Sequence, residues 1–202
     1  MPESRWAKAT GGTHGADYAA RFEALAASGM DMHGEATLCA ALAPPGSRVL
    51  DAGCGTGRVA IRLSELGYHC VGVDCDESML NVARGASSGV EWLAADLAEL
   101  GDLGTPFDLI VAAGNVIPLL AAGTEAAVIQ ALAARLEPTG VFVAGFGLDA
   151  AHLPIPEPPF TIHEYDAWCA AAGFQVVERF STWSREPWDD RGYAVTVCRL
   201  SG

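Results

Sequence analysis

Apolar positions recur with one period in the early part of the chain and with another in the rest. Side chains such as Tyr18 and Phe22 recur at helical spacing, so residues 17–43 are predicted to be helical, ending at the PPG sequence of residues 44–46. Two glycines inside this stretch should break or bend it. Residues 1–16 are polar and contain glycines, so we expect them to be mobile or ordered only on binding.

Downstream of residue 46, short apolar runs alternate with amphipathic runs. Strands are predicted at residues 48–52, 69–73, 90–94, 107–112 and 141–146, and helices at 58–66, 78–84, 124–136 and 162–172. A turn at residues 137–140 should lead into the fifth strand, and two last strands, 175–182 and 193–200, should form an antiparallel hairpin. Alternating strands and helices indicate βαβ units, with a parallel sheet and helices on both faces.

The sequence VLDAGCGTG at residues 49–57 ends the first predicted strand on an acid and continues with three glycines. Glycine lets a ligand lie against bare main chain, in space that side chains at positions 53 and 55 would occupy. In an open α/β sheet, ligands bind at the carboxyl ends of the strands. This turn is therefore predicted to approach a flat or extended ligand closely.

Two acids further along the chain narrow the choice of ligand. A nucleoside triphosphate loop needs a lysine that is absent here, and the dinucleotide fingerprint needs a third glycine where Arg58 stands. Asp74, after the second strand, is placed to accept both hydroxyls of a ribose, and Asp96, after the third, to receive an adenine amino group. The pattern predicts an adenosine site without phosphates.

Five segments carry a resemblance to a known family. They are VLDAGCGTG (49–57), VGVDCDESML (71–80), LAADL (93–97), FDLIVAAGNVIPLL (107–120) and LEPTGVFVAGF (136–146). In this order they resemble the class I S-adenosylmethionine-dependent methyltransferases. The resemblance implies an α/β fold, a Rossmann-like, doubly wound sheet of seven strands in the order 3-2-1-4-5-7-6 with strand seven antiparallel. It also implies S-adenosyl-L-methionine as cofactor, S-adenosyl-L-homocysteine as product, and methyl transfer to a small-molecule acceptor by in-line displacement.

The resemblance further implies a set of cofactor-binding residues. The matching positions are Tyr18, Asp51, Gly53, Gly55, Asp74, Cys75, Met79, Asp96, Leu97, Ala113, Gly114 and Asn115. The two glycines would lie against the methionine part of the cofactor, Asp51 would anchor the turn and Asp74 would hold the ribose. The members from Cys75 to Leu97 would surround the adenine, and those from Ala113 to Asn115 would lie beneath the cofactor or at the cavity. Tyr18 would either cover the cofactor or pack in the core.

An activated methyl group needs an oriented nucleophile more than it needs a catalytic side chain. A hydroxyl acceptor would also need a general base, whereas an unprotonated amine would not. His33 and His152 are the candidate bases, because lids commonly form in this fold at the N-terminal segment and after strand five. We expect one domain over residues 1–202, with a helical lid at 1–45 and the Rossmann-like core at 47–202.

Charge and composition narrow the partners. The formal net charge is −13 and Lys8 is the only lysine, which disfavours nucleic acid and an anionic membrane surface as partners. No apolar run reaches the roughly 18 residues that span a bilayer, and the N-terminus lacks a secretory signal, so we expect a cytoplasmic protein, a monomer or homodimer. The six cysteines show no ligand spacing, so no metal site is predicted.

Two other functions stay open on the sequence alone. The chain could bind the cofactor as a non-catalytic sensor or scaffold, or it could be a nicotinamide-dependent oxidoreductase. Arg58 and the short length argue against the oxidoreductase. The sequence does not assign the methyl acceptor or its reacting atom, which could be oxygen, nitrogen or carbon.

Overall fold

A seven-stranded sheet in the order β3-β2-β1-β4-β5-β7-β6 forms the centre of the molecule. The computed structural model describes residues 3–29 and 31–201. The strands are β1 (Arg48–Ala52), β2 (His69–Asp74), β3 (Glu91–Ala94), β4 (Phe107–Ala112), β5 (Leu136–Gly147), β6 (Phe174–Phe180) and β7 (Tyr193–Leu200). β7 runs antiparallel to both of its neighbours, and the other neighbouring pairs are parallel. The order and the strand directions confirm the predicted fold class.

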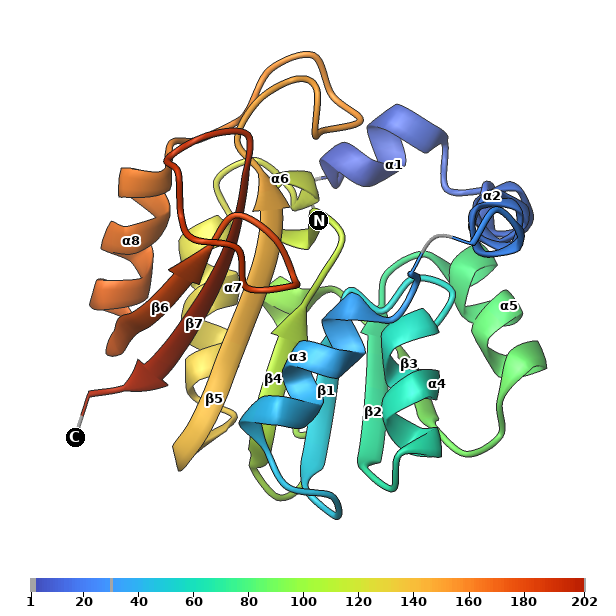
Figure 1. The fold of residues 1–202 in the computed structure, drawn as a ribbon, viewed down its shortest axis with the longest axis horizontal. Helices are drawn as coiled ribbons and strands as arrows, with labels where there is room; N and C mark the ends of the chain where they lie inside the picture. The colour runs from blue at the N-terminus through green and yellow to red at the C-terminus, as the bar shows by residue number, and fades with distance from the viewer. Residues whose placement is uncertain (1–2, 30, 202) are drawn as a thin grey trace.

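Helices cover both faces of the sheet (Figure 1). They are α1 (Arg5–Thr10), α2 (Gly15–Ala27), α3 (Gly34–Leu42), α4 (Arg58–Glu65), α5 (Glu77–Ala86), α6 (Val116–Leu119), α7 (Glu125–Ala133) and α8 (Ile162–Ala171), with a 3₁₀ turn η1 (Leu97–Glu99). Two clusters of buried apolar side chains join the layers, one under α3 and α4 and the other under α7 and α8. Val49 and Leu50, which are successive residues of β1, belong to opposite clusters, as expected for a strand covered on both faces.

α1 lies in the region that was expected to be mobile, so that expectation is wrong for residues 5–10. Ser4 Oγ accepts a hydrogen bond from the Ala7 N–H at the start of the helix, and Gly11 ends it in the left-handed conformation. Such a short helix depends on tertiary contacts. Its side chains bond to partners 120 and 70 residues away, which no local pattern reveals.

β5 begins earlier than the sequence predicts. α7 ends at Ala133, and Leu136 already pairs with Phe107 of β4, so the predicted helix end and the predicted turn at 137–140 are wrong. The pairing with β4 is irregular between Phe107 and Leu109, which accommodates a proline in the first part of the strand. A turn-like composition is therefore overridden by pairing with a neighbouring strand.

The carboxyl ends of β1, β2 and β4 lie at the upper edge of the sheet in Figure 1, with α1 and α2 above them. The turn between β1 and α4 is fixed from the side by Trp92 of β3. A Cβ atom at either Gly57 or Gly72 would overlap the indole ring, whose Nε1–H donates to the Ser87 carbonyl (3.0 Å). The edge strand, β2 and the turn can therefore pack this closely only because two residues lack a side chain.

Replacing Gly72 with alanine tests this packing. We expect Gly72→Ala to destabilise the protein by about 1–3 kcal/mol in urea denaturation, because the added methyl group overpacks a buried site. In a Trp92→Leu background the same change should cost at least about 1 kcal/mol less. Gly85→Ala in α5 is the matched control, since a Cβ there meets nothing within 4 Å and should be neutral or stabilising. Equal stability of Gly72→Ala and the parent would contradict the close packing of Gly72 against Trp92.

Candidate functional site

A cavity of about 640 Å³ opens at the carboxyl ends of β1, β2 and β4, and residues of α1 and α2 form its roof. The predicted site residues that line it are Tyr18, Asp51, Gly53, Gly55, Asp74, Cys75, Met79, Asp96, Leu97, Ala113, Gly114, Asn115 and His152. The volume of the cavity lies within the range of about 300–1,000 Å³ that is usual for small-molecule sites. The fold therefore brings these predicted residues to one place.

His33 is the predicted residue that does not line this cavity. It precedes α3 with an exposed side chain, and its backbone N–H donates to Asp31 Oδ1 (2.8 Å). The roof of the cavity comes from α1 and α2, upstream of His33. Its position gives no support to a catalytic role in this cavity.

Gly53 and Gly55 lack a side chain for different reasons. Gly53 has φ +76°, and a Cβ there would lie 2.5 Å from Val116 Cγ2. At that position the space for a side chain is already taken by the protein, contrary to the expectation that a ligand needs it. Gly55 has φ +54°, and a Cβ there would meet nothing within 4 Å, so this residue leaves open space at the cavity wall.

Asp51 is a carboxyl group buried at the base of the cavity, with 2% of its surface exposed. Its Oδ2 accepts from the Ala60 N–H in the first turn of α4 (3.1 Å). Burial raises the pKa of Asp51 from 3.8 to about 7, against the opposing effects of this hydrogen bond and of Arg58. Such a group gains stabilisation when a cation enters the cavity beside it.

Asp74 ends β2 with both carboxylate oxygens bound to backbone donors. Oδ2 accepts from the Gly55 N–H and Oδ1 from the Asp76 N–H, each at 2.8 Å. Burial raises the pKa of Asp74, and these two bonds oppose the rise. Each oxygen keeps a lone pair, so the carboxylate is held at the cavity wall with capacity for two further donors.

Asp96 is held in another way. Its Oδ1 accepts from the Ala98 N–H (2.9 Å) and caps η1, whose first residue, Leu97, is buried. Nearby, Cys75 is exposed and Met79 is buried in α5, and both reach the cavity wall. This end of the cavity thus combines one anchored acid with sulfur-containing and apolar side chains.

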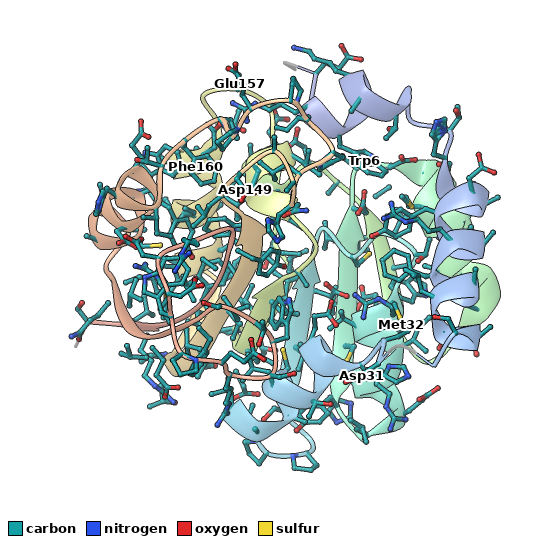
Figure 2. The ribbon with its side chains drawn as sticks, turned by 45° about the horizontal axis from the view of Figure 1, so that its top comes forward. Trp6, Asp31, Met32, Asp149, Glu157 and Phe160 are labelled. Atoms are coloured by element: carbon teal, nitrogen blue, oxygen red, sulfur yellow. The ribbon has the colours of Figure 1, made fainter. Side chains whose placement is uncertain are left out.

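The roof is bound to both sides of the cavity by consecutive residues of α1. Arg5 Nη1 donates to Glu125 Oε1 (2.7 Å), and Trp6 Nε1 donates to Asp76 Oδ2 (2.8 Å). Figure 2 shows Trp6 reaching from α1 toward the elements that follow β2. No sequence pattern points to Trp6, because its partner follows β2, 70 residues away.

Three aromatic rings line the cavity under this roof. The Tyr18 ring lies edge-on to Trp6 with centroids 6.0 Å apart, and 4.7 Å from the Phe22 ring. Burial raises the pKa of Tyr18. The hydroxyl of Tyr18 comes within 4.0 Å of the position that a Cβ of Gly114 would take, on the opposite wall. Tyr18 therefore faces the cavity, as one of its two predicted alternatives required.

Arg58 joins the roof to the glycine turn. Its guanidinium donates two hydrogen bonds to Glu35 (2.5 and 2.8 Å) and a third to the Met32 carbonyl, and it lies over the Phe22 ring. In the sequence, Arg58 is recognisable only as a departure from a glycine fingerprint. No motif spacing points to Glu35 as its partner.

Asn115 uses its amide for structural contacts. It has φ +71°, Oδ1 accepts from the Gly147 N–H (2.7 Å), and Nδ2 donates to the His152 carbonyl (2.9 Å). Asn115 therefore holds the loop after β5 against the loop after β4. Although it lines the cavity, both polar groups of its side chain are engaged by backbone.

Residues 3–29 and 31–201 contain neither a metal-binding cluster nor a helix that could span a membrane. No group of three or more His, Cys, Asp or Glu side chains there is arranged to hold a metal ion. In the same part of the chain, no helix has both the length and the apolar character to cross a bilayer. The cysteines are buried except for Cys75.

Comparison with known proteins agrees with this geometry. A family described as "Methyltransferase domain" matches residues 49–140. The crystal structure of a TehB-like SAM-dependent methyltransferase from Corynebacterium glutamicum aligns with a TM-score of 0.84 and 31% identity, covering 93% of this chain and 98% of that one.

Curated relatives match over shorter segments. The methyltransferase YodH of Bacillus subtilis is 31% identical over 166 residues, 73% of this chain and 68% of the relative. A second Bacillus subtilis protein named as a methyltransferase, YqeM, is 37% identical over 71 residues, and that match spans 34% of this chain and 29% of the relative.

The buried carboxyl of Asp51 predicts an unusual dependence of stability on pH. Because its pKa is raised from 3.8 to about 7 in the folded state, the folded protein binds an extra proton between these values. The free energy of unfolding without ligand should therefore fall as pH rises from about 4 to 7 and level off above.

Asp51→Asn removes this dependence. It should be more stable than the parent at pH 8, by up to about 4 kcal/mol, in urea denaturation. Asp108→Asn, which changes an exposed carboxyl on β4, is the control and should keep the slope of the parent. A lower stability of Asp51→Asn at pH 8 would refute the assignment.

Proposed function

The chain belongs to the class I S-adenosylmethionine-dependent methyltransferases, and on this premise we propose that it binds S-adenosylmethionine in the cavity and transfers the methyl group to a small-molecule acceptor. The observation that carries the proposal is the combination of open space at Gly55 with the anchored carboxylate of Asp74 on the same cavity wall. Exposed main chain and a carboxylate that can accept hydrogen bonds from two hydroxyl groups therefore lie side by side.

The donor groups on the cavity wall suit this cofactor. Asp74 would accept the ribose hydroxyls, and Gly55 would lie against the methionine part. Asp51, whose pKa of about 7 leaves it ready to ionise, would be stabilised beside a cation. The ring of Tyr18 would add a cation–π attraction to a sulfonium that passes over it.

When bound, S-adenosylmethionine supplies a methyl group already activated on sulfur. The residues of this chain therefore need only to position the methyl acceptor and to enclose it. Orientation of a nucleophile in line can contribute about 7–11 kcal/mol to lowering a barrier. The roof formed by α1 and α2, bound through Arg5 and Trp6, would keep water from the acceptor. Confinement beneath that roof favours a small-molecule acceptor.

Two measurements test the function. Titration calorimetry with S-adenosylmethionine and with S-adenosylhomocysteine should give saturable binding, and a screen of acceptors with labelled methyl donor should give labelled product. Binding of both without any transfer would favour a sensor or scaffold, and binding of neither would refute the proposal.

Asp74→Asn tests the cofactor site directly. We expect the Kd for S-adenosylmethionine and for S-adenosylhomocysteine to rise at least tenfold, because each charge-assisted hydrogen bond contributes about 1.5–3 kcal/mol. Asp190→Asn makes the same charge change in an exposed loop and is the matched control. Unchanged affinity in Asp74→Asn would contradict the ribose assignment.

A further inference from the structure

His152 lies on the cavity wall in a loop that fixes both its backbone and its ring. Its carbonyl accepts from Asn115 Nδ2 (2.9 Å), and its Cβ and carbonyl lie against Gly147, where an added Cβ would come within 2.7 Å. The ring lies against Gly192, where a Cβ would come within 2.8 Å of Cε1. Two residues without side chains therefore make room for His152, Gly147 at the end of β5 for its backbone and Gly192 just before β7 for its ring.

Asp149 determines which ring nitrogen carries the proton. Asp149 Oδ1 lies 2.7 Å from His152 Nδ1, and a carboxylate can only accept, so Nδ1 carries the hydrogen. The hydrogen bond from His152 lowers the pKa of Asp149. Figure 2 labels Asp149 on the loop after β5. With Nδ1 occupied, Nε2 is the basic nitrogen of the neutral ring.

His14 also lines the cavity and provides a contrast. It precedes α2, and no hydrogen bond to its ring occurs among the described residues. Two titratable groups lie beside the His152 ring: Asp149 on its own loop, and Tyr193 of β7, whose ring centroid is 6.2 Å from that of the imidazole. The Tyr193 hydroxyl is already bound by Trp183 Nε1 (3.2 Å).

From this geometry we propose that His152 is a general base held by Asp149, and that the methyl acceptor is therefore a hydroxyl on an aromatic ring. This inference rests on the proposed methyl transfer. A thiol is already partly ionised near neutral pH and a neutral amine needs no deprotonation, so neither needs such a base.

The acidity of the acceptor narrows the class of hydroxyl. A phenol has a pKa of about 10, whereas an alcohol that resembles water has a pKa of about 16, so a phenol gives up its proton to a neutral imidazole far more readily. A phenol is therefore the better proton donor to this base. The three aromatic rings on the cavity wall, those of Trp6, Tyr18 and Phe22, suit a flat aromatic acceptor.

Proton removal and methyl transfer occur in one step. His152 Nε2 takes the proton from the acceptor hydroxyl while the oxygen forms a bond to the methyl carbon. The carbon–sulfur bond breaks, and its electron pair stays on sulfur. The His152 side chain is 47% exposed, so the imidazolium can return its proton to water. Asp149 acts through His152 as a positioning residue.

The test compares acceptors that differ in acidity. With S-adenosylmethionine present, catechol and phenol should be methylated on oxygen and benzyl alcohol should not, and any transfer to thiophenol or aniline should not depend on His152. His152→Gln should lower kcat for phenol by about 10²–10⁴-fold with little change in KM. Transfer to 4-nitrophenol, at a pH where this acceptor is already ionised, should be almost unaffected. His163→Gln, an exposed histidine of α8, is the matched control.

Asp149 also accepts from the Ala151 and His152 N–H groups, so its structural role has to be separated from its role toward the ring. Asp149→Asn should lower kcat for phenol roughly tenfold or more with little change in KM, while transfer to ionised 4-nitrophenol should be almost unaffected. A purely structural role would lower the rate for both acceptors.

Nitrogen NMR of the protein without cofactor gives a readout independent of turnover. Neutral His152 should carry its proton on Nδ1, and Asp149→Asn should increase the Nε2–H form. An Nε2–H ring in the parent overturns the inference, and so does equal loss for phenol and 4-nitrophenol in His152→Gln. Transfer only to non-hydroxyl acceptors, or to none while cofactor still binds, also overturns it. Absence of cofactor binding instead refutes the proposed function.

Discussion

The close approach of backbone to backbone around the turn after β1 is the constraint on which the rest of the site depends. Val116 occupies the space beside Gly53, and Trp92 occupies the space beside Gly57 and Gly72. Any side chain at those positions would push β2, β3 or the loop after β4 away from β1. Because Asp51 and Asp74 stand at the ends of two of these strands, the spacing of the site's acids depends on the same contacts.

Charge in the cavity follows from this packing. The turn presents the Gly55 N–H to Asp74, whereas Asp51 is enclosed with one backbone donor and its pKa is raised to about 7. Arg58 compensates part of the negative charge, but its guanidinium is committed to Glu35. The chain as a whole carries a formal net charge of −13, so a cationic ligand enters a favourable field while nearby acids provide the specific contacts.

Local patterns predicted those features that are set by neighbouring residues. The apolar runs of β1, β2 and β4, the capping box at Thr161 and the glycine turn can all be read from a few consecutive residues. The strand order followed from family resemblance. By contrast, the helix at residues 5–10, the early start of β5 and the pairing of Arg58 with Glu35 depend on partners that are distant in sequence.

The same distinction, between features that local sequence predicts and features that depend on distant contacts, holds for the residues of the site. Asp51 and Asp74 lie in the last two residues of their strands and Asp96 lies two residues after β3, so their place at one edge of the sheet could be predicted. The hydrogen bonds of the Asn115 amide and the packing of His152 against two glycines could not be predicted, because loop conformation decides them.

Arg5 and Trp6 show a further consequence of the structure. Adjacent in the chain, they bind elements that follow β4 and β2, so α1 links the two, and both contacts would have to break for α1 to leave the cavity.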